Sequence, residues 1–103
     1  MTAPLRVLVV DDEAQARKRL ARLLTAVPEH RLVGACASAD EALRLVDALE
    51  PDVVLLDISM PGMSGLEAAR TRLPSSLAVV FVTAHAEHAV DAFALDAADY
   101  ILK

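Results

Sequence analysis

Short aliphatic runs that alternate with helix-like segments constrain the fold of this 103-residue chain more than any other feature. Three of the runs, VLVV, VVLL and AVVFV, lack polar alternation, which is typical of strands buried on both faces of a parallel sheet. The run RLVGACA is weaker and contains Gly34, as an edge strand can. The predicted strands are Leu5–Val10, Arg31–Ala37, Val53–Asp57, Leu77–Thr83 and Tyr100–Lys103.

Helical periodicity fills the intervals between these runs. Ser38 and Glu41 form a capping box, which predicts the start of a second helix that ends before Pro51. Two further helices are predicted over Gly65–Arg72 and Glu87–Leu95. The first helix has a basic outer surface and an apolar stripe, and the stripe consists of Ala16, Leu20, Leu23, Leu24 and Val27. This alternation predicts an α/β fold with a doubly wound, five-stranded parallel sheet.

Composition limits the class of protein. A hydrophobic fraction of 55% with only 3% aromatic residues indicates one domain with an aliphatic core. The net charge of −5 argues against a nucleic-acid-binding surface, which would carry a basic excess. No apolar stretch approaches the roughly 20 residues that span a bilayer, so no membrane partner is predicted. The single cysteine, Cys36, indicates a small buried hydrophobe in a cytoplasmic protein.

Polar residues follow the central strands at the points where the strands end. Asp11 and Asp12 follow the first strand, Asp57 ends the third, Thr83 ends the fourth and Lys103 ends the fifth. Ligands of open parallel sheets bind at the carboxyl ends of the strands, so these side chains should lie on one edge. Three carboxylates repel one another unless a cation joins them, and Mg²⁺ prefers such oxygen ligands. Helix capping explains Asp11 and Asp12 but not the whole set.

With these residues in place, the chain resembles the receiver domain of bacterial two-component response regulators. The resemblance covers the whole chain in family order. The matching stretches are VLVVDDE (Val7–Glu13), VVLLDISMPGMSG (Val53–Gly65), VFVTA (Val80–Ala84) and DYILK (Asp99–Lys103). The resemblance implies a flavodoxin-like fold with strand order 2-1-3-4-5. The implied function is a signalling switch that catalyses only its own phosphorylation and dephosphorylation.

The resemblance also implies a role for each site residue. Asp57 would be the phosphoacceptor, and it would hold Mg²⁺ together with Asp11, Asp12 and the backbone carbonyl of Ser59. Thr83 and Lys103 would bind phosphoryl oxygens. When Thr83 moves, the switch aromatic Tyr100 would rotate inward.

The family further implies partners and a longer chain. A sensor histidine kinase would donate the phosphoryl group and dock around the first helix, near Arg17, Lys18 and Arg22. The alternative is that these charges only solubilise the helix. Phosphorylation would promote a homodimer, and DNA would be bound only through an output domain absent here. The segment around the fourth helix resembles receivers that precede LytTR-type DNA-binding domains. Residues 1–103 would form a receiver domain truncated after the fifth strand, and loss of the fifth helix would leave Val7, Val9 and Ile101 as candidates for an uncovered apolar surface.

Three alternative functions make different demands on the sequence. A phosphatase of the haloacid dehalogenase type needs a second aspartate two residues after the nucleophile, where this chain has Ser59. A receiver-like module that takes no phosphate should lack Asp57, Thr83 or Lys103, and all three are present. A cobalamin-binding domain needs an Asp-x-His-x-x-Gly loop, which this chain lacks. His85 and His88 are interpreted as rim and surface positions, not as metal ligands.

Overall fold

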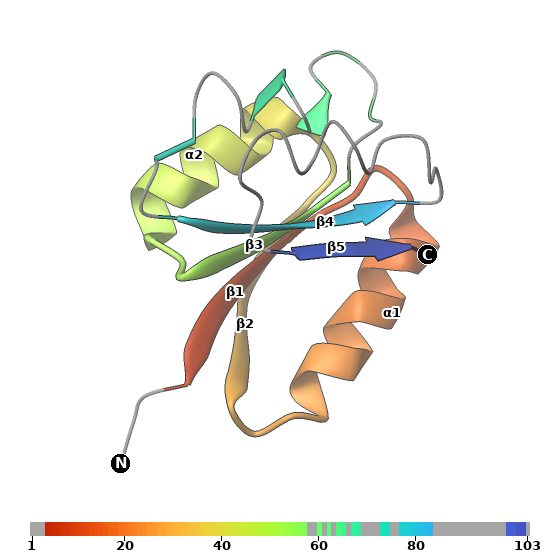
Figure 1. The fold of residues 1–103 in the computed structure, drawn as a ribbon, viewed down its shortest axis with the longest axis vertical. Coiled ribbons are helices and arrows are strands. Elements are labelled where there is room, and N and C mark those ends of the chain that lie inside the picture. Colours follow the sequence, from red (N-terminus) through yellow and green to blue (C-terminus); the bar gives the residue numbers. More distant parts are fainter. Residues whose placement is uncertain are drawn as a thin grey trace.

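The structure, a computed structural model, contains one parallel sheet of five strands (Figure 1). It describes residues 4–57, 60, 62, 64, 65, 67, 68, 73, 74, 77–83 and 99–102, with the backbone alone for 83 and 99–102. The strands are β1 (Leu5–Val10), β2 (His30–Cys36), β3 (Val53–Leu56), β4 (Ala78–Thr83) and β5 (Asp99–Leu102). Their order, β2-β1-β3-β4-β5, confirms the predicted topology.

Two helices, α1 (Ala14–Thr25) and α2 (Ala39–Leu49), lie on opposite faces of the sheet (Figure 1). Side chains alternate between the two faces along each strand, so the sheet contributes to two separate cores. The core on the α1 face consists of Val7, Val9 and Leu24, with Leu20, Leu32, Val53 and Leu55 beside them. The core on the α2 face includes Leu8, Val10, Cys36, Ala39, Ala42, Val46, Val54, Leu56 and Phe81.

The α1 face corrects two of the predictions. Val7 and Val9 are only 3% and 0% exposed, because Leu24 of α1 packs over them, so the prediction that they belong to an uncovered surface is wrong. The prediction that Leu23 and Val27 belong to the buried stripe of the first helix is also wrong, because their side chains are 60% and 36% exposed. The side chain of Ile101 lies outside the described residues.

β2 forms one edge of the sheet, as the weak pattern around Gly34 predicts. The pairing of β1 with β2 is irregular: Val7 pairs with Leu32 but the next residue, Leu8, pairs with Gly34. A Cβ atom at Gly34 would lie 3.1 Å from a methyl group of Leu49 and 3.3 Å from one of Leu8. Glycine therefore allows α2 to pack closely on the edge strand.

The helix signals correspond to observed caps. The Ser38 hydroxyl accepts a hydrogen bond from the Glu41 backbone N–H (3.2 Å) at the start of α2, as the capping box predicts. Ser64 begins the predicted third helix in the same way: its hydroxyl accepts from the Glu67 N–H (3.1 Å) and its carbonyl from the Ala68 N–H (3.0 Å). The end of that helix and the predicted helix 87–95 lie outside the described residues. Within the part of the chain that the structure describes, no helix is long and apolar enough to cross a membrane.

Candidate functional site

Three carboxylates meet at the carboxyl edge of the sheet. Asp11 and Asp57 directly follow the neighbouring parallel strands β1 and β3, and the Asp57 N–H donates to the Val10 carbonyl (2.9 Å). This hydrogen bond extends the strand pairing to the point where both carboxylates emerge. Asp12 follows at once in the β1–α1 loop. One carboxylate oxygen from each of Asp11, Asp12 and Asp57 lies within 4.8 Å of the other two, which confirms that the fold brings these residues together.

The burial of this cluster decides its chemistry. Asp11 is 1% exposed and Asp57 is 5% exposed, whereas Asp12 faces solvent. The Asp11 carboxylate accepts a hydrogen bond from the Glu13 N–H (2.9 Å), which orients it. Like charges at this spacing, two of them nearly removed from water, repel one another unless a cation balances them. The donor set, three carboxylate oxygens, fits a hard divalent cation such as Mg²⁺.

Of the remaining predicted site residues, the structure describes the backbone of Thr83 in β4 and of Tyr100 in β5. Thr83 is the last residue of β4, which lies beside β3, so its backbone is on the carboxyl edge; its side chain lies outside the described residues. Thr83 pairs with Leu102 of β5, and Lys103 comes next in the chain. Ser59 and Lys103 lie outside the described residues, as does the side chain of Tyr100.

One contact at the site is missed by reasoning from the sequence. Arg17 of α1, predicted as an exposed docking charge, is half-buried, and its Nη1 donates to the main-chain carbonyl of Asp11 (2.8 Å). The neighbouring Lys18 and the more distant Arg22 are exposed, as predicted. The position of Arg17 in the first turns of α1 is the signal that could have revealed the contact, because helical side chains lean toward the helix N-terminus.

Cys36 ends β2 next to this loop but has a structural role. It is 3% exposed, as predicted for a small buried hydrophobe, and its Sγ lies 3.8 Å from the Ser38 carbonyl. Its backbone carbonyl accepts from the Asp11 N–H (3.1 Å), which ties the β1–α1 loop to the edge strand. Burial, and secondarily the charge of Glu41, raises the pKa of the Cys36 thiol to about 11.

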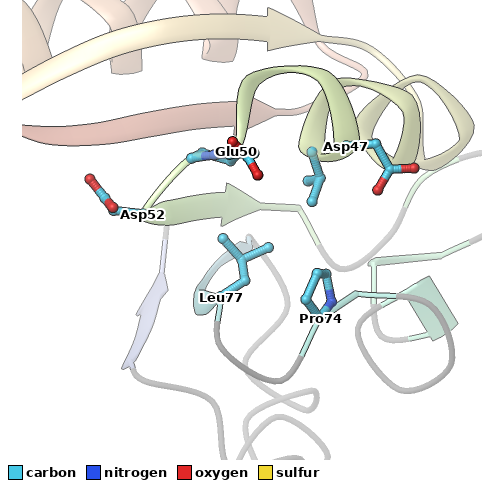
Figure 2. A pocket seen from close by; sticks show the side chains of 7 residues that line it. Asp47, Glu50, Asp52, Pro74 and Leu77 are labelled. Atoms are coloured by element: carbon cyan, nitrogen blue, oxygen red, sulfur yellow. The ribbon is translucent and has the colours of Figure 1, made fainter.

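A pocket of about 360 Å³ lies at the opposite end of β3, between α2 and the segment before β4 (Figure 2). Arg6 forms hydrogen bonds with two residues that line the pocket. The Arg6 backbone N–H donates to the Asp52 carboxylate (2.9 Å), and the Arg6 Nη1 donates to the Glu50 carbonyl (3.0 Å). None of the three clustered aspartates lines this pocket. Its lining consists of Val46, Asp47, Glu50, Pro51, Asp52, Pro74 and Leu77.

Comparisons with known proteins agree with this geometry. The family model for the response regulator receiver domain matches residues 7–103. The positive alginate biosynthesis regulatory protein of Pseudomonas aeruginosa is 47% identical over 102 residues, which cover 96% of this chain and 41% of that protein. The transcriptional regulatory protein BtsR of Salmonella typhi is 46% identical over 100 residues, with 96% and 42% covered. The chain thus spans about two fifths of the length of these curated relatives.

Solved structures show the same architecture. The response regulator domain of Thermotoga maritima CheB aligns with a TM-score of 0.87 at 32% identity, covering 97% of this chain and 78% of that one. A two-component response regulator of the LuxR family from Aurantimonas sp. SI85-9A1 aligns with a TM-score of 0.90 at 31% identity, covering 98% and 75%. This chain belongs to the family of response regulator receiver domains, the domains that act as phosphoacceptor switches in signalling.

Proposed function

We propose that Asp57 accepts the phosphoryl group of this switch and that Mg²⁺ is held beside it by Asp11, Asp12 and Asp57. The observation that carries the proposal is the convergence of the three carboxylates within 4.8 Å at the end of the central strand β3. Only Asp57 of the three lies directly at the carboxyl end of that strand, between the loop after β1 and the end of β4.

The reaction follows from the chemistry of a carboxylate. One oxygen of Asp57 attacks the phosphorus of the donor and a P–O bond forms, giving an acyl phosphate. The bond from phosphorus to the leaving group breaks in line, and the leaving group keeps the electron pair. The leaving group is an imidazole nitrogen for a phosphohistidine and an acetate oxygen for acetyl phosphate. Bound Mg²⁺ would neutralise charge on the phosphoryl oxygens.

The other predicted residues complete the proposal. The backbone carbonyl of Ser59 would add a ligand for the metal. The Thr83 hydroxyl and the Lys103 ammonium group would donate hydrogen bonds to the phosphoryl oxygens, since both are suited to an anion. Tyr100 would then follow Thr83 in the conformational switch. The domain would turn over no external substrate.

The partners and location are proposed from the family and the relatives. A sensor histidine kinase would supply the phosphoryl group, and a phosphorylation-dependent homodimer would carry the signal. Because two relatives with the same receiver segment are named as regulatory proteins and are more than twice as long, we propose a transcriptional output through a DNA-binding domain outside this chain.

In a longer chain, residues 1–103 would be the receiver domain, and a further helix would cover the half-buried Val53 and Leu55. The free, buried thiol of Cys36 is in keeping with a cytoplasmic protein.

The proposal is tested by intact mass after incubation with acetyl phosphate and Mg²⁺. The wild-type chain should gain one phosphoryl group that hydroxylamine removes, because acyl phosphates are labile to that nucleophile. Asp57→Asn should gain none. Asp52→Asn is the matched control, because Asp52 is an exposed aspartate at the other end of β3 and should leave labelling unchanged.

Labelling of Asp57→Asn to the wild-type level would show that Asp57 is not the acceptor. A wild-type chain that gains no phosphoryl group would favour the receiver-like module that takes no phosphate. Continuous release of inorganic phosphate from simple phosphate esters would instead favour the phosphatase.

A further inference from the structure

We propose that Arg17 is a positioning residue that holds the Asp11–Asp12 loop in its metal-binding conformation. The inference rests on the proposed function, because it concerns the same acidic site. Arg17 lies in α1, and its Nη1 donates to the main-chain carbonyl of Asp11 at 2.8 Å in a part-buried setting. The side chains of Lys18 and Arg19 are exposed, so Arg17 differs from its basic neighbours in what it contacts.

The loop is held at several points, each with a different effect. The Asp11 N–H bonds to the Cys36 carbonyl (3.1 Å) and fixes the start of the loop on β2. The Glu13 N–H bonds to the Asp11 carboxylate (2.9 Å) and fixes that side chain. The Arg17 contact fixes the carbonyl of the peptide that joins Asp11 to Asp12. Rotation of this peptide would move Asp12, the exposed member of the cluster, away from the other two carboxylates.

The helix places Arg17 for this contact. The Arg17 N–H donates to the carbonyl of Glu13 (3.1 Å), the residue that caps α1, so Arg17 sits one turn into the helix. From there the side chain leans back toward the N-terminus, where the loop lies. A guanidinium stays charged at any ordinary pH and offers several donors in a rigid plane, which suits a permanent brace.

The expected consequence is a change in metal affinity. Residues that orient metal ligands without touching the metal commonly change affinity by about ten- to a hundredfold, and Arg17 orients Asp12 only through the backbone. We therefore expect Arg17→Ala to raise the Kd for Mg²⁺ about tenfold. Loss of a positive charge near the site acts in the opposite direction, and Arg17→Lys, which keeps the charge, separates this effect from the loss of the hydrogen bond.

The experiment is calorimetric titration of Mg²⁺ into the metal-free chain, with thermal unfolding recorded alongside. Arg17→Lys, which keeps the charge and one donor group, should give a Kd between those of the wild type and Arg17→Ala. Lys18→Ala removes one charge from the neighbouring exposed position and should leave the Kd unchanged. Leu24→Ala removes a buried side chain of the same helix, 9% exposed, and should lower the melting temperature without changing the Kd.

Several results would overturn the proposal. They are an Arg17→Ala protein that binds Mg²⁺ as tightly as the wild type or more tightly, and a Leu24→Ala protein whose Kd rises as much as that of Arg17→Ala. The latter would show that general destabilisation of α1 explains the effect. These results leave the proposed function intact, provided the wild type binds Mg²⁺ and is labelled on Asp57. A wild type that binds no Mg²⁺ removes the basis of both proposals.

Discussion

Cys36 illustrates how position within the sheet sets the reactivity of one residue. Its thiol lies in the α2-side core, and burial raises its pKa from 9.0 to about 11. At pH 8 the folded protein should therefore hold about a hundredfold less thiolate than the unfolded chain. We expect a thiol reagent to modify Cys36 at least that much more slowly in buffer than in urea. Equal rates in the two solvents would contradict the burial of this thiol.

The same pKa shift predicts a pH dependence of stability. A pKa raised in the folded state means that the folded state binds the proton more tightly. The thiol's contribution to the free energy of unfolding is thus complete below pH 9 and is lost as the pH rises from about 9 to about 11. Cys36→Ala should show a smaller loss in that window, measured by urea unfolding at each pH.

At the scale of the element, α2 ends in a strained conformation that can be tested. Glu50 adopts φ 48° and ψ 60°, the left-handed region that favours glycine, and its carbonyl accepts from Arg6. Glu50→Gly keeps that carbonyl and removes the unfavourable Cβ, so it should raise the free energy of unfolding by about 0.5–1 kcal/mol. Arg44→Gly, at an exposed position inside α2, should lower it by about 0.8 kcal/mol. A loss of stability in Glu50→Gly as large as that in Arg44→Gly would refute the idea of strain.

At the scale of the whole molecule, the cluster of Asp11, Asp12 and Asp57 should lower the stability of the metal-free protein and raise it when Mg²⁺ binds. Without Mg²⁺ the three carboxylates repel one another, so Asp12→Asn should melt at a higher temperature than the wild type. With Mg²⁺ at ten times its Kd, the wild type should gain about 1.4 kcal/mol, or about 6–11 °C in melting temperature. Asp12→Asn should gain much less. Asp47→Asn, an exposed aspartate on α2, should respond to Mg²⁺ as the wild type does; a wild-type melting temperature that Mg²⁺ does not change would rule out the metal site.

The sheet and the acidic cluster could both be predicted from local patterns. Runs such as VLVV and VVLL are long enough to identify central strands, and a parallel sheet places every carboxyl end on one edge. The residue that follows a strand therefore has a predictable position, which is why Asp11, Asp12 and Asp57 were expected to meet. The capping signal at Ser38 is local in the same sense, because a hydroxyl three residues before an N–H can reach only that part of the backbone.

Contacts between elements could not be predicted in this way. Val7, Val9 and Leu23 are all apolar, but which of them are buried depends on how α1 lies across the sheet. The helix covers Val7 and Val9 and leaves its own Leu23 in solvent. Composition and helical periodicity do not distinguish Arg17 from its basic neighbours. Its contact with Asp11 exists because the β1–α1 loop turns the chain back over the first turns of α1, and that turn is a property of the folded backbone.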